Sequence, residues 1–101
     1  MVAIRPFREA DSARLVEILI QNSQYSYPAV EGPEAMIRSS RSDATVFLVA
    51  VSEGVPVGLI RAVYDGTRAI IHLLSVATES QHQGIGTALV TAARSELRRP
   101  G

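Results

Sequence analysis

Residues 69–89 read AIIHLLSVATESQHQGIGTAL, and this stretch decides the predicted fold. It opens with the apolar run Ala69–Val76, whose β-branched residues predict a buried strand. A polar connector follows, and then apolar residues recur at the three- and four-residue spacing of an amphipathic helix: Ile85, Leu89, Ala92, Ala93 and Leu97. The sequence therefore predicts a strand that leads through a glycine-containing loop into a helix.

The loop Gln81–Gly86 reads QHQGIG and is predicted to bind an anion. The first amides of a helix have no partner within it and the helix dipole is positive there, so a phosphate is well accommodated. Gly84 and Gly86 place no Cβ between their amides and such a ligand. The residues leave one alternative open, that both glycines serve only the close packing of the helix against the sheet.

A dinucleotide-binding loop of the Rossmann type fits the same glycines poorly. Leu89 stands where the GxGxxG fingerprint has its third glycine, and no acidic residue follows at the required distance. The strands before the loop are joined by hairpins, whereas the Rossmann fold needs a parallel strand-helix-strand unit. The sequence therefore argues against this class of site.

Upstream of the loop, the chain predicts three antiparallel strands in a meander. Val46–Val51 is a continuous apolar run, typical of a central strand covered on both faces. Glu53-Gly54 turns the chain into Val57–Tyr64, and Asp65-Gly66 turns it again into Ala69–Val76. On this strand, His72 is expected to share a face with Ile70, Leu74 and Val76.

The N-terminal third predicts an edge strand and two helices. Val2–Phe7 reads as an edge strand because Pro6 cannot donate to a ladder. Asp11 or Ser12 is expected to cap a helix with apolar residues at helical spacing: Leu15, Ile18 and Leu19. A turn-rich loop over residues 21–32 then precedes a short helix from Pro33. At the other end, Arg94, Arg98 and Arg99 suit the negative end of the last helix, which Pro100 and Gly101 stop.

The predicted fold class is α/β of the α+β type, with one domain over residues 1–101. It is a mostly antiparallel sheet with flanking helices, in the order β-α-α-β-β-β-α.

Composition excludes several function classes. Ten acidic residues balance ten basic ones, and the basic ones form no run that suits a nucleic-acid backbone. All of them are arginine, which excludes Schiff-base lysines and the P-loop lysine, and the absence of cysteine excludes thiolate metal sites and cysteine nucleophiles. No metal site is predicted. No apolar run suggests a signal peptide or a membrane span, so we expect a cytoplasmic protein.

The pattern Gln-x-x-Gly-x-Gly, entered from Leu74-Ser75-Val76 and opening a helix, resembles the pyrophosphate loop of the Gcn5-related N-acetyltransferase (GNAT) family. The resemblance extends to Ile4-Arg5-Pro6 with Ala10-Asp11 and to the meander, and so spans essentially the whole chain. Thr78 departs from it, since the family often has proline there.

This resemblance implies a site for acetyl-coenzyme A as cosubstrate. The main chain of Leu74 and Val76 pairs with the pantetheine arm, amides from His82 to Thr87 hold the pyrophosphate, and Gln81 braces the loop. The implied cofactor-binding residues are Leu74, Ser75, Val76, Gln81, His82, Gln83, Gly84, Ile85, Gly86 and Thr87.

Direct acetyl transfer to an amine needs a general base, and His72 is the candidate. It stands where family members often carry a glutamate. The alternative is a partly buried histidine that donates to a backbone carbonyl. Tyr25 and Tyr27 lie in a region that borders the acceptor groove in the family, or else only pack within their loop.

Family members continue beyond the last helix with further strands, so the resemblance implies a truncated acetyltransferase-like fold that lacks the C-terminal strands. The function expected is an acetyl-coenzyme A-dependent N-acetyltransferase acting on a small-molecule or protein amine. The alternative is a non-catalytic coenzyme A-binding module for regulation or assembly. The apolar edge of Ala69–Val76 has no flanking strand in this sequence and predicts a homodimer.

Overall fold

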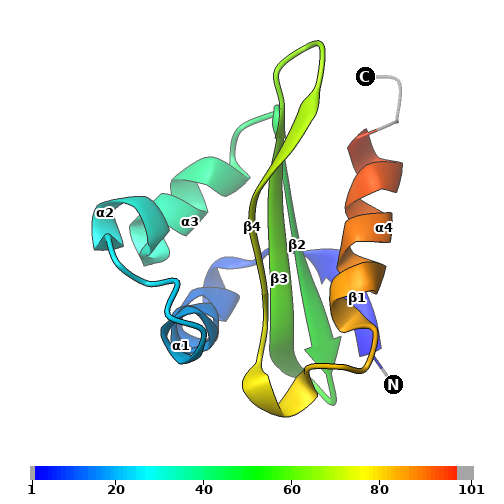
Figure 1. The fold of residues 1–101 in the computed structure, drawn as a ribbon. Helices are drawn as coiled ribbons and strands as arrows, with labels where there is room; N and C mark the ends of the chain where they lie inside the picture. The colour runs from blue at the N-terminus through cyan, green and yellow to red at the C-terminus, as the bar shows by residue number, and fades with distance from the viewer. Residues whose placement is uncertain (1, 98–101) are drawn as a thin grey trace.

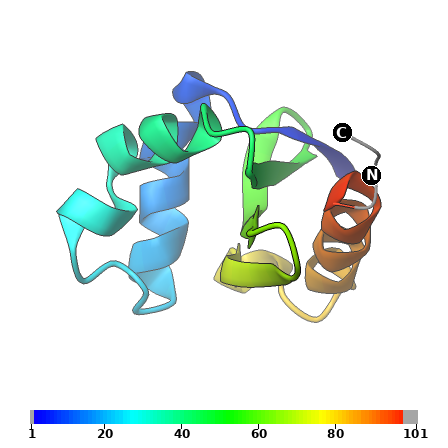
Figure 2. The same ribbon diagram turned by 90° about the horizontal axis from the view of Figure 1, so that it is seen from above.

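The computed structural model describes residues 2–97, which form a four-stranded antiparallel sheet between two layers of helices (Figure 1). The strands lie in the order β1 (Val2–Pro6), β2 (Thr45–Ser52), β3 (Val55–Tyr64) and β4 (Ala69–Val76). One face carries α1 (Ser12–Gln21), α2 (Pro28–Glu31) and α3 (Pro33–Ser40), and the other carries α4 (Ile85–Leu97), as the view from above shows (Figure 2). Two 3-10 turns, Glu9–Asp11 and Thr78–Ser80, precede α1 and α4. The predicted fold class is confirmed.

The meander follows the predicted turns. Glu53 and Gly54 both have left-handed backbones, with φ of +51° and +80°, and this geometry makes the tight turn between β2 and β3. In the next turn the Asp65 carboxylate accepts hydrogen bonds from the amides of Thr67 and Arg68, both at 2.9 Å. The centre of β2 is buried because helices cover both of its faces, as predicted.

Strand β4 departs from the prediction in two ways. Its first half, residues 69–72, is exposed, because the β3–β4 hairpin projects past the helical layers (Figure 1). A bulge then interrupts the pairing with β3: Arg61 pairs with Leu73 but Ala62 pairs with Ile71, so His72 is the extra residue.

The bulge changes the face on which His72 lies. Leu74 and Val76 pack on the α4 side of the sheet, whereas His72 lies beside Arg61 and Val63 on the side of α2 and α3. The prediction that His72 shares a face with Leu74 and Val76 is therefore wrong. Strict alternation along a strand holds only where the ladder is regular.

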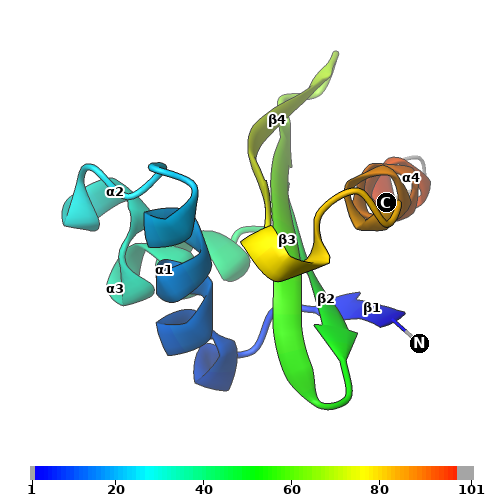
Figure 3. The ribbon, with the colours of Figure 1, turned by 60° about the horizontal axis from the view of Figure 1, so that its bottom comes forward.

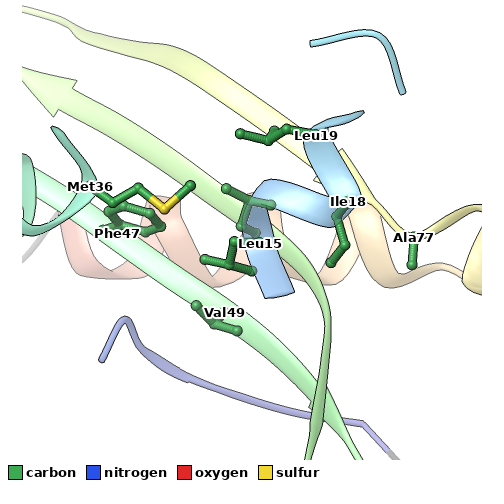
Figure 4. Packing of buried hydrophobic residues seen from close by; sticks show 8 residues of the cluster. Leu15, Ile18, Leu19, Met36, Phe47, Val49 and Ala77 are labelled. Carbon is green, nitrogen blue, oxygen red and sulfur yellow. The ribbon is translucent and has the colours of Figure 1, made fainter. Parts of the chain in front are cut away.

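Two hydrophobic clusters hold the layers together. On the α1 and α3 side, residues from both helices pack on the sheet (Figure 4): Leu15, Ile18, Leu19, Met36, Phe47, Val49, Leu59 and Ala77. On the other side the cluster contains Leu48, Ala50, Val57, Ile60, Ile85, Leu89 and Ala93. A Cβ at Gly58 would lie 3.2 Å from both Leu89 Cδ1 and the Ser75 carbonyl oxygen, so glycine here permits α4 to approach the sheet closely.

The helix starts differ in part from the predictions. Asp11 accepts 2.8 Å hydrogen bonds from both terminal nitrogens of Arg5 and from the Arg8 amide, while the Ser12 hydroxyl donates to the Glu9 carbonyl. Neither side chain caps α1, since no amide of its first turn donates to either of them. Helix α2 was missed within the predicted loop. The predictions for Arg98, Arg99, Pro100 and Gly101 lie outside the described residues.

Candidate functional site

A cleft of about 530 Å³ lies where β4, the connector after it and the start of α4 meet. Figure 3 shows the connector crossing from the end of β4 to α4, with the end of α1 on the other side of the strand. The lining residues are Asn22, Gln24, Leu74, Ser75, Val76, Ser80, Gln81, His82, Gly84, Ile85, Gly86 and Thr87. All the predicted cofactor-binding residues except Gln83 therefore line one cleft.

The loop presents free backbone amides to this cleft. The first hydrogen bond that closes α4 runs from the Ala88 amide to the Gly84 carbonyl. Within the described part of the chain, no oxygen accepts a hydrogen bond from the amides of residues 82–87. These amides, together with the positive end of the α4 dipole, can hold an anion.

Two residues of the loop have left-handed backbones, His82 with φ of +64° and Gly84 with φ of +83°. A Cβ built on Gly84 would meet no atom within 4 Å, and one on Gly86 would meet only Val76 Cγ2, at 3.9 Å. Neither glycine is therefore required for close packing of α4 on the sheet. That role belongs to Gly58, and the packing alternative for the loop glycines loses its main support.

The edge of β4 lines the same cleft. The carbonyls of Leu74 and Val76 accept hydrogen bonds from side chains and not from β3, so they lie on the strand's outer edge. In an antiparallel ladder the N–H and C=O of one residue point to the same side, so the amides of both residues also face this edge. The N–H and C=O groups of Ser75, which lies between them, point toward β3.

An amide network braces the connector. The Asn22 side-chain nitrogen donates to Ser75 Oγ at 2.7 Å and to the Val76 carbonyl at 2.9 Å. The Gln81 side-chain nitrogen donates to the same carbonyl at 3.0 Å and to Asn22 Oδ1 at 3.1 Å. Gln24 donates to the Leu74 carbonyl over a longer 3.3 Å. Sequence reasoning missed Asn22 and Gln24, because no local pattern links the end of α1 to a strand some fifty residues later.

The side chain of Arg14, on α1, contacts both β3 and the connector. Its guanidinium donates to the Pro56 carbonyl at 3.1 Å and pairs with the Glu79 carboxylate at 2.9 Å. The pKa of Glu79 is lowered, first by its own backbone amide and then by the hydrogen bond from Arg14. Glu79 thus links the connector to α1.

His72 lies outside this cleft. It is exposed and lines a second cleft of about 390 Å³ on the α2 and α3 side of the sheet. The two clefts meet β4 at His72 and Leu74, only two residues apart, or about 7 Å along the strand. Tyr25 packs partly against the core, whereas Tyr27 is largely exposed.

The second cleft contains a residue that sequence reasoning did not single out. Arg61, on β3, is buried and lines this cleft together with His72. Among residues 2–97 no group of three metal-ligating side chains occurs, and no helix is both long and apolar enough to cross a membrane.

Comparisons with known proteins agree with this geometry. A family model described as the acetyltransferase (GNAT) family matches residues 12–101. The acetyltransferase plu1384 of Photorhabdus laumondii is 32% identical over 94 residues, which cover 93% of this chain. The chain spans 65% of that relative's length.

Solved structures share the fold. The PaiA N-acetyltransferase of Thermoplasma acidophilum, in complex with coenzyme A, superposes with a TM-score of 0.80 at 18% identity, covering 96% of this chain and 72% of that one. The ribosomal-protein-S18-alanine N-acetyltransferase of Escherichia coli gives a TM-score of 0.78 at 15% identity, covering 96% and 59%. At such identities the likeness concerns the fold alone.

Proposed function

The chain belongs to the acetyltransferase (GNAT) family, whose chemistry is acyl transfer, and we propose that it uses acetyl-coenzyme A to acetylate an amine. The observation that carries the proposal is the set of free amides at residues 82–87, next to the open edge of β4 in one cleft. The coenzyme A complex of the PaiA structure, which shares this fold, supports the choice of cosubstrate.

The residues of the cleft fit the parts of coenzyme A. The amides of residues 82–87 suit the pyrophosphate, and Gly84 and Gly86 leave space for it. The pantetheine arm carries amides of its own, which can pair with the main chain of Leu74 and Val76 as an added strand does. The Val76 carbonyl already accepts hydrogen bonds from Asn22 and Gln81, so Val76 offers its amide to the arm. Gln24 must release the Leu74 carbonyl for the pairing, and its 3.3 Å hydrogen bond is the longest of those on this edge.

Acetyl-coenzyme A supplies a thioester carbonyl activated toward nucleophiles. In the transfer the amine nitrogen bonds to the carbonyl carbon, the carbon–sulfur bond breaks, the thiolate takes up a proton, and the amine loses one. In this chain the edge of β4 positions the thioester, and one side chain accepts the amine proton.

His72 is the proposed proton acceptor. Its imidazole is exposed and lies two residues along β4 from Leu74, where the pantetheine arm is placed by the proposal. The bulge directs it to the side of α2 and α3, so the acceptor amine is expected to enter from that face.

The direct test is calorimetric titration with acetyl-coenzyme A and coenzyme A, followed by a thiol-release assay with mixed amines. Binding together with thiol release that depends on an amine supports the proposal. Binding without turnover indicates a coenzyme A-binding module that regulates or assembles, and an absence of binding contradicts both.

A further inference from the structure

Arg61 is a buried cation without a partner. It lies near the middle of β3 with 9% of its surface exposed, and its guanidinium forms no hydrogen bond or ion pair with any residue among 2–97. A charge removed from water without compensation is costly, so such a residue calls for a counter-ion.

The guanidinium of Arg61 opens into the second cleft. Among the described residues that are not exposed, every side-chain nitrogen that is fully inaccessible to solvent has a hydrogen-bond partner. The guanidinium nitrogens of Arg61 have no partner, so they are accessible to solvent, and they reach it through the cleft that Arg61 lines. Ala29, Val30, Ala35 and Val63 form the apolar walls of this cleft, and the rest of its lining is polar: Arg38, Ser39, Thr45 and His72, beside Arg61 itself.

The nearby Glu31 carboxylate forms no ion pair with Arg61 among the described residues, and one of its two oxygens is already engaged. Glu31 exerts a Coulombic attraction on Arg61, but a Glu31 carboxylate oxygen accepts the Ser26 amide at 2.6 Å and the Tyr27 amide at 3.0 Å. Burial lowers the pKa of Arg61 and the Glu31 field offsets this in part, but arginine remains charged at neutral pH. Arg38 also lines the cleft, but it is exposed and adds positive charge.

We propose that the second cleft binds the carboxylate of the acceptor, so that the acetylated amine is an amino acid or a similar aminocarboxylate. Arg61 takes the carboxylate by its planar pair of N–H donors, the apolar walls hold a small side chain, and the amine lies toward His72 and the edge of β4. A monoanion is preferred because Arg61 is the one buried cation in the cleft. This proposal rests on the proposed function.

The binding test leaves coenzyme A out, so that its result is independent of transfer. Isovalerate and its uncharged analogue isovaleramide are titrated separately into the isotope-labelled chain, and amide resonances of β3 and β4 are followed by NMR. We expect isovalerate to bind with Kd on the order of 1 mM and to shift the resonances of Arg61 and His72. Isovaleramide should bind at least about tenfold more weakly.

Two variants localise the effect. Arg61→Met is expected to abolish isovalerate binding, whereas Arg68→Met, which removes the same charge from the exposed hairpin, should retain it. Equal binding of acid and amide, or unchanged binding by Arg61→Met, overturns the proposal. Preference for inorganic phosphate over isovalerate at equal ionic strength overturns the carboxylate assignment. If Arg61→Met does not fold, the comparison of acid with amide in the unmodified chain decides.

The acceptor assignment is tested in the thiol-release assay with leucine and leucinamide. A preference of at least about tenfold in kcat/KM for leucine, lost in Arg61→Met, supports it. Equal turnover of the two overturns it, even if isovalerate binds. Failure to bind acetyl-coenzyme A contradicts the proposed function, whereas failure to bind isovalerate contradicts only the carboxylate site.

Discussion

At the scale of single residues, the two histidines of the sequence lie in different parts of the structure. His82 lies in the loop of the first cleft with a left-handed backbone, and His72 lies at a bulge between the two clefts. A non-glycine residue in the left-handed region carries strain of about 1 kcal/mol, so the loop conformation at His82 is maintained by its surroundings. In the proposed function, the main chain of His82 contributes to cofactor binding and the side chain of His72 to the chemistry.

Replacing His72 by alanine is predicted to lower amine-dependent turnover about 100-fold and to leave the affinity for coenzyme A unchanged, because in the proposal the imidazole accepts the amine proton, and it does not line the first cleft. The loss should fall on kcat and not on the KM for acetyl-coenzyme A. Stability should change little, since the side chain is exposed.

The control for this prediction is His82→Ala, which removes the other exposed imidazole and keeps the backbone amide. It should retain the kcat of the unmodified chain. An unaltered kcat in His72→Ala would mean that the proton leaves by another route and that His72 has no part in the chemistry.

At the scale of the elements, the sequence predicts most of this fold. The meander, the connector and α4 were expected within one or two residues, because turn pairs such as Glu53-Gly54 and the spacing of Ile85 and Leu89 are local signals. The bulge at His72 could not be expected, since it depends on how β4 pairs with β3 and not on the sequence of β4 alone.

The candidate site, too, can be predicted from the sequence only where its signals are local. The loop over residues 81–86 is recognisable from its glycines, whereas the contribution of Asn22 and the burial of Arg61 arise from tertiary packing. An arginine in an apolar strand has no sequence signal that tells a buried cation from an exposed one. The apolar residues around Arg61 predict the strand but not the burial of its guanidinium.

The start of α1 gives a prediction at this scale. Asp11 joins β1 to the turn before α1 through Arg5 and the Arg8 amide, and the hydrogen bond from Arg5 is the main cause of its lowered pKa. Asp11→Asn is predicted to lower the free energy of unfolding at pH 7 by about 2–3 kcal/mol, because it leaves Arg5 without its charged partner.

The direction of the Asp11 pKa shift determines how the stability of the chain depends on pH. A carboxyl group whose pKa is lower in the folded chain adds stability above its unfolded pKa, near 3.9, and this stability is lost as the pH falls through the folded value. Chemical denaturation from pH 7 to pH 3 should therefore narrow the difference in stability between the unmodified chain and Asp11→Asn. A difference that is unchanged at pH 3 would contradict this account.

At the scale of the whole molecule, β4 leaves part of its edge uncovered. Side chains of Asn22, Gln24 and Gln81 occupy the edge at Leu74 and Val76, but the other end of the strand has no such cover among the described residues, and Ile70 and Ile71 are 45% and 49% exposed. An apolar strand without charged side chains promotes association. The homodimer predicted from the sequence remains a proposal, with this end of β4 as its interface.

Light scattering at several concentrations checks the assembly of the 101-residue chain. We predict a dimer that dissociates on dilution, and a shift toward monomer in Ile71→Lys, since a charge at the strand edge discourages pairing. Thr91→Lys adds the same charge at an exposed position of α4 and should leave the dimer intact. A monomer at all concentrations would refute the interface.

The central claim, that the loop over residues 81–87 binds coenzyme A through its backbone, is tested most directly by calorimetry on a matched pair of glycine variants. Gly84 and Gly54 have nearly equal φ of +83° and +80°, and both have open space around the Cβ position, but only Gly84 lines the first cleft. Valine at either position should cost about 1–3 kcal/mol of stability from backbone strain. We predict that Gly54→Val binds coenzyme A like the unmodified chain and that Gly84→Val does not bind it; equal affinities in the two variants would contradict the account.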